Sequence, residues 1–114
     1  MLKKINRLNK KKDFDRVFRR GRSFYSQKIG LKACPNGLDV SRVGIVVSTK
    51  VDKKATQRNL IKRRLREIVR LKMDQIKKSY DLMMIARPGL ADLKYQELKR
   101  EVELVLKKLQ ILIP

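Results

Sequence analysis

The sequence predicts a single α+β domain, an α/β sandwich in which helices pack on one sheet in the order α-β-β-α-β-α, with room for a further strand. One observation is a helical apolar period between residues 53 and 78, and another is a set of short apolar or alternating segments bounded by turn residues. The chain of 114 residues is 42% hydrophobic, which suffices for one core and not for two. Residues 1–114 are therefore expected to form one domain.

The N-terminal region is expected to contain a flexible basic arm, residues 1–12, followed by a short helix. Asp13 is a suitable N-cap residue, and Gly21 is a suitable helix stop. The apolar face of this helix would consist of Phe14, Val17 and Phe18.

Three segments have the character of strands. Lys28 to Cys34 alternates apolar and polar residues, and Arg42 to Ser48 is rich in β-branched residues. The turn signal Pro35-Asn36-Gly37 between them predicts that the two strands pair as a hairpin. Tyr80 to Ala86 is short and apolar and predicts a buried strand, which Arg87-Pro88-Gly89 would end.

Two helices are expected in the second half. On a helical wheel, the long helix from Lys53 to Lys78 has one apolar arc, made of Ile61, Leu65, Ile68, Val69 and Ile76. Asp92 is the expected cap of the last helix, whose apolar stripe would be Tyr95, Leu98, Val102, Val105, Leu106 and Leu109.

The charge is large and unevenly placed. Lys and Arg number 31 against 11 acidic residues, a net charge of +20. Almost all of the excess positive charge lies in residues 1–32 and 50–78, whereas charge that served only solubility would be spread evenly along the chain. Such a charge repels itself unless a polyanion neutralises it, so nucleic acid is the leading partner and an anionic membrane the second.

The basic arc of the long helix is the main candidate site. Asn59, Lys62, Arg63, Arg66 and Arg70 lie together on the wheel, with Ala55 among them. An ordinary solvated face mixes charges of both signs, but only Glu67 interrupts the basic residues between 58 and 72. This pattern favours a phosphate-binding face over a merely solvated one.

Phe14 and Phe18 lie one turn apart among arginines and allow two interpretations. They pack in the core, as most Phe pairs at this spacing do, or they border a site where unstacked bases of a single strand stack.

Catalytic and metal-binding patterns are missing from the sequence. There is no His, the acidic residues are scattered, and Ser48-Thr49-Lys50 has no base beside it other than Lys. The single Cys34 is expected to be a small buried hydrophobic residue. We therefore expect no catalytic residue and no bound metal in this chain. In any enzyme that contains this chain, another molecule would supply the catalytic groups.

No apolar run is long enough to span a membrane and no secretory signal is visible, so a cytoplasmic location is expected.

The motif Ala55-x-x-Arg58-Asn59-x-x-Lys62-Arg63-x-x-Arg66-Glu67 resembles the signature helix of the protein subunit of bacterial ribonuclease P. The resemblance extends over nearly the whole chain. It includes Asn6-Arg7-Leu8, Asp13-Phe14-x-x-Val17-Phe18-x-x-Gly21, Arg42-Val43-Gly44-Ile45-x-Val47-Ser48, and Tyr80-Asp81 through Ala86-Arg87. The chain departs from the family pattern at Leu60, where the family usually has Arg, and at Lys32, where some relatives have an aromatic residue.

The resemblance implies a sandwich fold shared with a domain of a small-subunit ribosomal protein, with a left-handed βαβ crossover through the long helix. It implies a non-catalytic subunit that binds, as a monomer in a one-to-one complex, the catalytic RNA that removes the 5′ leader of precursor tRNA. Magnesium would be bound mainly by that RNA. The RNA subunit would contact Lys54, Arg58, Asn59, Lys62, Arg63, Arg66 and Arg70. The leader or the tRNA would contact Phe14, Phe18, Lys28, Lys32, Ser48, Lys50 and Arg87.

Three other functions remain open at this point. A ribosomal or ribosome-assembly protein would share the charge and size, and an architectural DNA-binding protein would favour duplex DNA. A membrane-surface peptide is disfavoured, because the strand patterns indicate a packed core.

Overall fold

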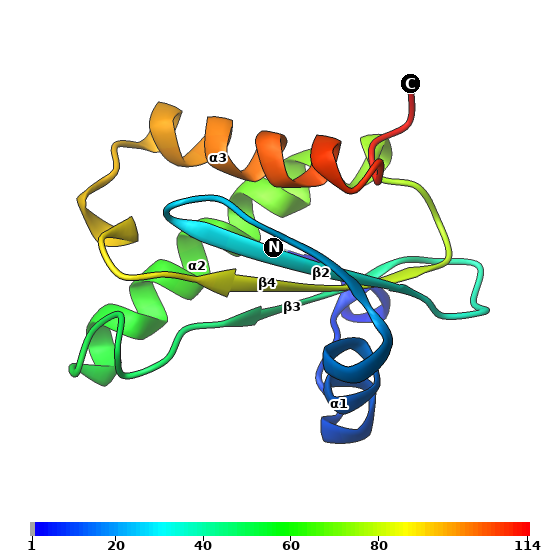
Figure 1. The fold of residues 1–114 in the computed structure, drawn as a ribbon, viewed down its shortest axis with the longest axis horizontal. Coiled ribbons are helices and arrows are strands. Elements are labelled where there is room, and N and C mark those ends of the chain that lie inside the picture. Colours follow the sequence, from blue (N-terminus) through cyan, green and yellow to red (C-terminus); the bar gives the residue numbers. More distant parts are fainter. Residues whose placement is uncertain (1) are drawn as a thin grey trace.

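The computed structural model describes residues 2–114 and contains three helices and four strands (Figure 1). These elements are α1 (Lys11–Arg20), β1 (Arg22–Tyr25), β2 (Ile29–Pro35), β3 (Arg42–Val46), α2 (Ala55–Lys72), β4 (Tyr80–Ala86) and α3 (Tyr95–Lys108). Short 3-10 turns occupy Lys4–Asn6, Met73–Gln75 and Leu90–Asp92. The mixed α+β fold agrees with the predicted class.

The strand order in the sheet is β1-β2-β4-β3. β2 pairs antiparallel with β1 and β4, whereas β3 pairs parallel with β4. The predicted hairpin between 28–34 and 42–48 is therefore wrong, because the crossover through α2 returns β4 to a position between those two strands. The actual hairpin partner of β2 is β1, whose four residues are too few and too exposed to show an alternating pattern.

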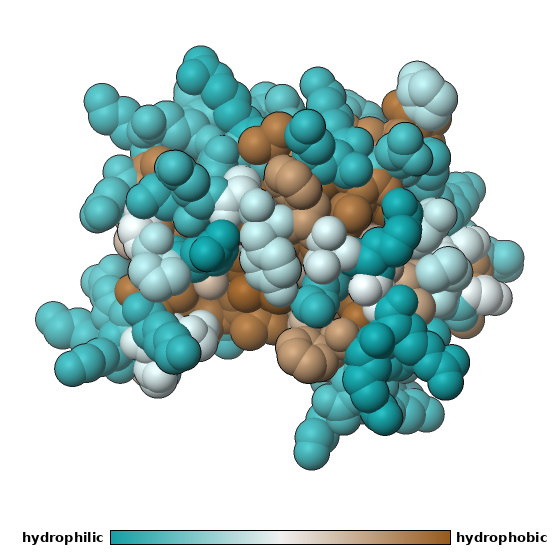
Figure 2. Space-filling view, viewed as in Figure 1, coloured by the Kyte–Doolittle hydropathy of each residue, from teal (hydrophilic) through white to brown (hydrophobic). Residues whose placement is uncertain are grey.

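The two faces of the sheet are covered differently. One face buries Leu31, Leu82 and Met84 against residues of α2 and α3 such as Leu65 and Leu106, and this is the main core. The opposite face carries α1 over a small cluster of Leu8, Val17, Cys34 and Met83. Figure 1 shows α3 and α1 on opposite sides of the sheet, and Figure 2 shows hydrophilic residues around the outline with hydrophobic ones toward the middle. Cys34 is buried, as predicted.

Several predicted helix boundaries are corrected. α1 begins at Lys11, so Asp13 lies in its first turn and does not cap it. α3 begins after Lys94, whose backbone N–H donates to Oε1 of Glu97 at 3.0 Å, and Asp92 lies in the preceding 3-10 turn. α2 is shorter than the predicted 53–78, because the chain tightens into the 3-10 turn at Met73–Gln75.

The described part of the N-terminal segment packs on the domain and is not the free arm that was predicted. Leu2 and Leu8 are buried, because they supply apolar surface to the two cores. The backbone N–H of Leu8 donates to the Val43 carbonyl at 3.0 Å, and the Asn6 amide donates to the Ser41 carbonyl at 2.9 Å. Met1 lies outside the described residues.

The side chain of Asp81, at the start of β4, is fully buried and joins α1 to the sheet. It accepts two hydrogen bonds from Arg42, at 2.8 and 2.7 Å, and one from Arg16 of α1. Arg42 also lies 3.4 Å from Asp13 of α1. The hydrogen bonds from Arg42 to Asp81 raise the pKa of the guanidinium above its ordinary value. This network fixes α1 on its face of the sheet.

Asp81→Asn is expected to lower the free energy of unfolding by about 3 kcal/mol, because it leaves two arginines beside an uncharged, buried amide. Urea denaturation measures this loss. Asp39→Asn, at an exposed turn residue, is the matched control and should change stability by less than about 0.5 kcal/mol. Equal denaturation midpoints for the two variants would contradict the role given to Asp81.

Candidate nucleic-acid interface

The basic arc predicted for α2 lies at the molecular surface. Lys54 and Arg58, which the family resemblance adds to this arc, lie at the start of the same helix. We call the combined set the helix face and define it by Lys54, Arg58, Asn59, Lys62, Arg63, Arg66 and Arg70. Lys54, Asn59, Arg63 and Arg66 are exposed, and the other three are half-buried. The opposite arc, with Ile61, Leu65, Ile68 and Val69, is buried against the sheet. The predicted two-sided character of this helix is therefore confirmed.

The start of the helix face is held by the loop before α2. Nη1 of Arg58 donates to the carbonyl oxygens of Asp52 and Lys53, at 3.0 and 2.8 Å. The Asp52 carboxylate accepts the Lys54 backbone N–H at 2.9 Å. Because these carbonyls are neutral, Arg58 keeps its full positive charge while its position is fixed.

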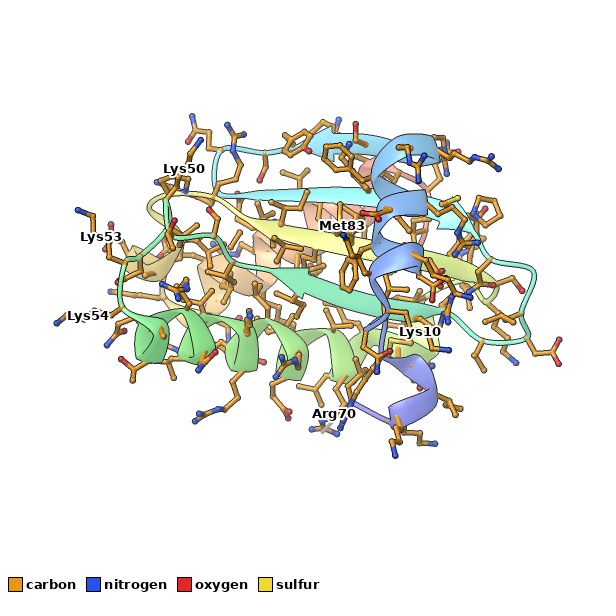
Figure 3. The ribbon with its side chains drawn as sticks, turned by 90° about the horizontal axis from the view of Figure 1, so that it is seen from below. Lys10, Lys50, Lys53, Lys54, Arg70 and Met83 are labelled. Carbon is orange, nitrogen blue, oxygen red and sulfur yellow. The ribbon has the colours of Figure 1, made fainter. Side chains whose placement is uncertain are left out.

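The end of the helix face is partly neutralised. Arg70 forms an ion pair with Glu67 one turn earlier, and its hydrogen bonds lower the pKa of Glu67, which keeps that carboxylate ionised. Within residues 2–114, Lys62, Arg63 and Arg66 have no carboxylate partner. In Figure 3, Lys54 and Arg70 lie at opposite ends of α2. The uncompensated charge is thus concentrated between Lys54 and Arg66.

The face of the sheet that carries α1 is the second surface, and we call it the sheet face. Phe18 is 63% exposed, and Nζ of Lys32 lies 4.5 Å from the centre of its ring. Phe14 is half-buried and lies directly over Gly44, where a Cβ atom would come within 2.3 Å of the ring. Phe14 therefore packs in the small core, as the first interpretation of the Phe pair predicts, whereas Phe18 faces solvent and does not.

The remaining predicted contacts lie beyond the strands at one end of the sheet. The backbone N–H of Arg87 donates to the Lys28 carbonyl at 3.0 Å, so the two residues are adjacent. Val46 pairs in parallel with Ile85, which brings the segments that follow β3 and β4 to the same end of the sheet. Ser48 and Lys50, both exposed, follow β3, and Figure 3 shows Lys50 projecting at the end of the molecule where α2 begins.

One exposed aromatic residue on the sheet face was not predicted as part of a site. Tyr25 of β1 is 45% exposed, and the Arg87 guanidinium lies 5.6 Å from the centre of its ring. The available sequence signal is the Ser23-Phe24-Tyr25 run, since aromatic residues favour strands, but this run lies between two predicted elements.

The chemistry available at these surfaces is binding through charge and stacking. In the part of the chain that the structure describes, no three His, Cys, Asp or Glu side chains are grouped so that they could hold a metal ion. No helix of residues 2–114 is long and apolar enough to cross a membrane. The helix face has cationic side chains, and the sheet face has exposed aromatic rings close to cations. Together these groups are suited to binding a polyanion with planar bases.

Comparisons with known proteins agree on one family. A family model described as Ribonuclease P matches residues 2–110. The ribonuclease P protein component of Clostridium botulinum (strain Loch Maree / Type A3) is 39% identical over 106 residues, which cover 92% of this chain and 95% of the relative. That of Dehalococcoides mccartyi (strain ATCC BAA-2266 / KCTC 15142 / 195) is 40% identical over 111 residues, or 97% of this chain and 90% of the relative.

Solved structures agree with the sequence relatives. The ribonuclease P protein of Staphylococcus aureus has a TM-score of 0.86 at 31% identity, over 95% of this chain and 98% of that one. The ribonuclease P protein of Thermotoga maritima has a TM-score of 0.81 at 34% identity, over 90% of this chain and 96% of that one.

Proposed function

This chain belongs to the ribonuclease P protein family, and we propose that it binds the catalytic RNA subunit of ribonuclease P and the 5′ leader of precursor tRNA. Its role in a tRNA-processing ribonuclease complex follows from the family. The finer assignment rests mainly on one observation: the helix face has uncompensated positive charge on a helix whose other side is fixed in the core. A rigid row of cations can match the fixed spacing of phosphates in a folded RNA.

The helix face is the surface that we assign to the RNA subunit. Arg63 and Arg66 are exposed guanidinium groups, and each can donate two hydrogen bonds to one phosphate. Neutralising phosphates releases counterions, which favours binding at low salt and stabilises a compact RNA conformation. Because Arg58 is already held by backbone carbonyls, it loses little conformational freedom on binding.

The sheet face is the surface that we assign to the leader. Phe18 offers an exposed ring, Lys32 lies against it, and Lys28, Lys50 and Arg87 add positive charge at the adjoining end of the sheet. A flexible single strand can place its bases on such rings and its phosphates on such cations. Mature tRNA has no leader, so this contact would favour the precursor over the product.

We assign the cleavage step and its magnesium to the RNA subunit, with this chain as a single copy that contributes binding energy in the cytoplasm. Within residues 2–114, carboxylates such as Asp81 and Asp13 are used in ion pairs with arginines, which supports assigning the magnesium to the RNA. Bound magnesium would supply the charge that stabilises the leaving and attacking oxygens. The cations of this chain would lower the repulsion between RNA phosphates around it.

Adding the chain to transcribed ribonuclease P RNA at low magnesium is expected to raise the rate of precursor tRNA cleavage, because the bound protein lowers phosphate repulsion. The measurement is a cleavage time course with 5′-labelled precursor, with the RNA alone and the protein alone as controls. Cleavage at the leader junction by the protein alone would overturn the non-catalytic assignment. An unchanged rate with the protein present would overturn the proposed function.

Replacing Arg63 and Arg66 together by Ala is expected to weaken binding to the RNA subunit and to reduce the slope of log affinity against log salt by about two, one for each phosphate that the variant no longer neutralises. The measurement is filter binding over a salt series. Arg100→Ala with Lys107→Ala, two exposed cations on α3, is the charge-matched control. An equal change in slope for both pairs would show that net charge matters and the helix face does not.

Phe18→Ala is expected to reduce the preference of the reconstituted complex for precursor over mature tRNA by about fivefold or more, because it removes one stacking surface. Phe14→Ala should instead lower the stability of the protein by about 2–3 kcal/mol, because it leaves a cavity over Gly44. Binding titrations with both tRNAs and urea denaturation measure these effects. A stability loss for Phe18→Ala as large as that for Phe14→Ala would place Phe18 in the core as well.

A further inference from the structure

Tyr25 occupies a row of the sheet face next to the one that contains Lys32. The register pairs Tyr25 with Gly30 and Ser23 with Lys32, and β4 continues the two rows with Ile85 and Met83. Side chains of directly paired residues point to the same face, so Tyr25 projects on the side that carries α1. Its neighbour Phe24 projects to the other side and packs against the main core.

Gly30 makes room for the Tyr25 ring to lie against the sheet. A Cβ atom at position 30 would come within 2.4 Å of two ring carbons, Cδ1 and Cε1, which is far inside van der Waals contact. The ring is therefore backed by the β2 backbone, while Tyr25 remains 45% exposed. An aromatic ring that is backed by the sheet and still partly exposed is a suitable surface for a planar ligand.

Arg87 fixes the ring from a second direction. Its guanidinium lies 5.6 Å from the ring centre, within the range of a cation–π contact. Nη1 of Arg87 donates to the Ser26 carbonyl at 2.6 Å, which ties the guanidinium to the β1–β2 turn. The guanidinium lies over the ring, and its remaining N–H groups can donate to the phosphate of a nucleotide whose base contacts the exposed part of the ring.

We propose that Tyr25, backed by Gly30 and flanked by Arg87, is a second base-stacking position for single-stranded RNA on the sheet face. Phe18 with Lys32 is the first position, and Tyr25 with Arg87 repeats the same pairing of a ring and a cation one row away. This inference rests on the proposed function, since it extends the path of the leader from α1 across β2 to β1.

The test compares Tyr25→Ala and Tyr25→Phe with Tyr95→Ala in the complex reconstituted with ribonuclease P RNA. Tyr95 is the matched control, because it is 49% exposed and lies on α3, across the sheet from α1. Tyr25→Ala is expected to weaken binding of leader-bearing precursor by about fivefold or more, with no change for mature tRNA, whereas Tyr25→Phe keeps the ring and changes binding less than about twofold. Tyr95→Ala should leave both affinities unchanged.

Two outcomes separate this inference from the function on which it rests. If the unmodified complex does not prefer leader-bearing precursor, the proposed leader contact fails and this inference fails with it. If the preference is present and Tyr25→Ala retains it in full, only the Tyr25 position is overturned. Equal reductions in affinity for precursor and mature tRNA would also overturn it, because the contact would then not involve the leader.

Gly30→Ala provides an independent variant that leaves Tyr25 in place. The added methyl group must displace the ring, so this variant should weaken precursor binding in the otherwise unmodified protein and weaken it no further when combined with Tyr25→Ala. Thermal unfolding of each variant shows whether the fold persists. Full additivity of the two effects would contradict a role for Gly30 in seating the ring.

Discussion

The placement of α1 depends on one buried carboxylate. Asp81 lies at the start of a central strand and accepts hydrogen bonds from Arg16 of α1 and Arg42 of β3. The apolar contact under α1 is small, so this charge network has an unusually large part in setting the helix on the sheet. Phe18 is carried by that helix, so the network that holds α1 also helps to hold Phe18 near Lys32.

Three of the carboxylates in the described residues join elements of the fold to one another. Asp13 and Asp81 hold α1, and Glu103 accepts a hydrogen bond from the buried Lys72 at 2.6 Å, which joins α2 to α3 and lowers the pKa of Glu103. The outward cations are thus left without acidic partners on the helix face from Lys54 to Arg66. The same distribution of acidic residues that stabilises the domain leaves positive charge on its surface that a polyanion can neutralise.

Much of this arrangement could be predicted from local patterns. The bounds of Tyr80–Ala86 are predictable, since a continuous apolar run between turn residues has few alternatives, and the two arcs of α2 follow from its helical period. The pairing of strands could not be predicted, because the insertion of β4 between β2 and β3 is a long-range event with no local signal. The role of Tyr25 was not predictable for a related reason: its significance depends on Gly30, five residues away, and on Arg87 at the end of β4.

The N-terminal segment has a consequence for how the free protein behaves in solution. β3 is a strand at the margin of the sheet, and the bridge between Arg7 and Val43 occupies part of its outer hydrogen-bonding side. The other margin, β1, is only four residues long and begins with a charged side chain. Neither margin offers a long template for a strand of a second molecule, so the protein resists edge-to-edge aggregation during the time between its synthesis and its assembly with RNA.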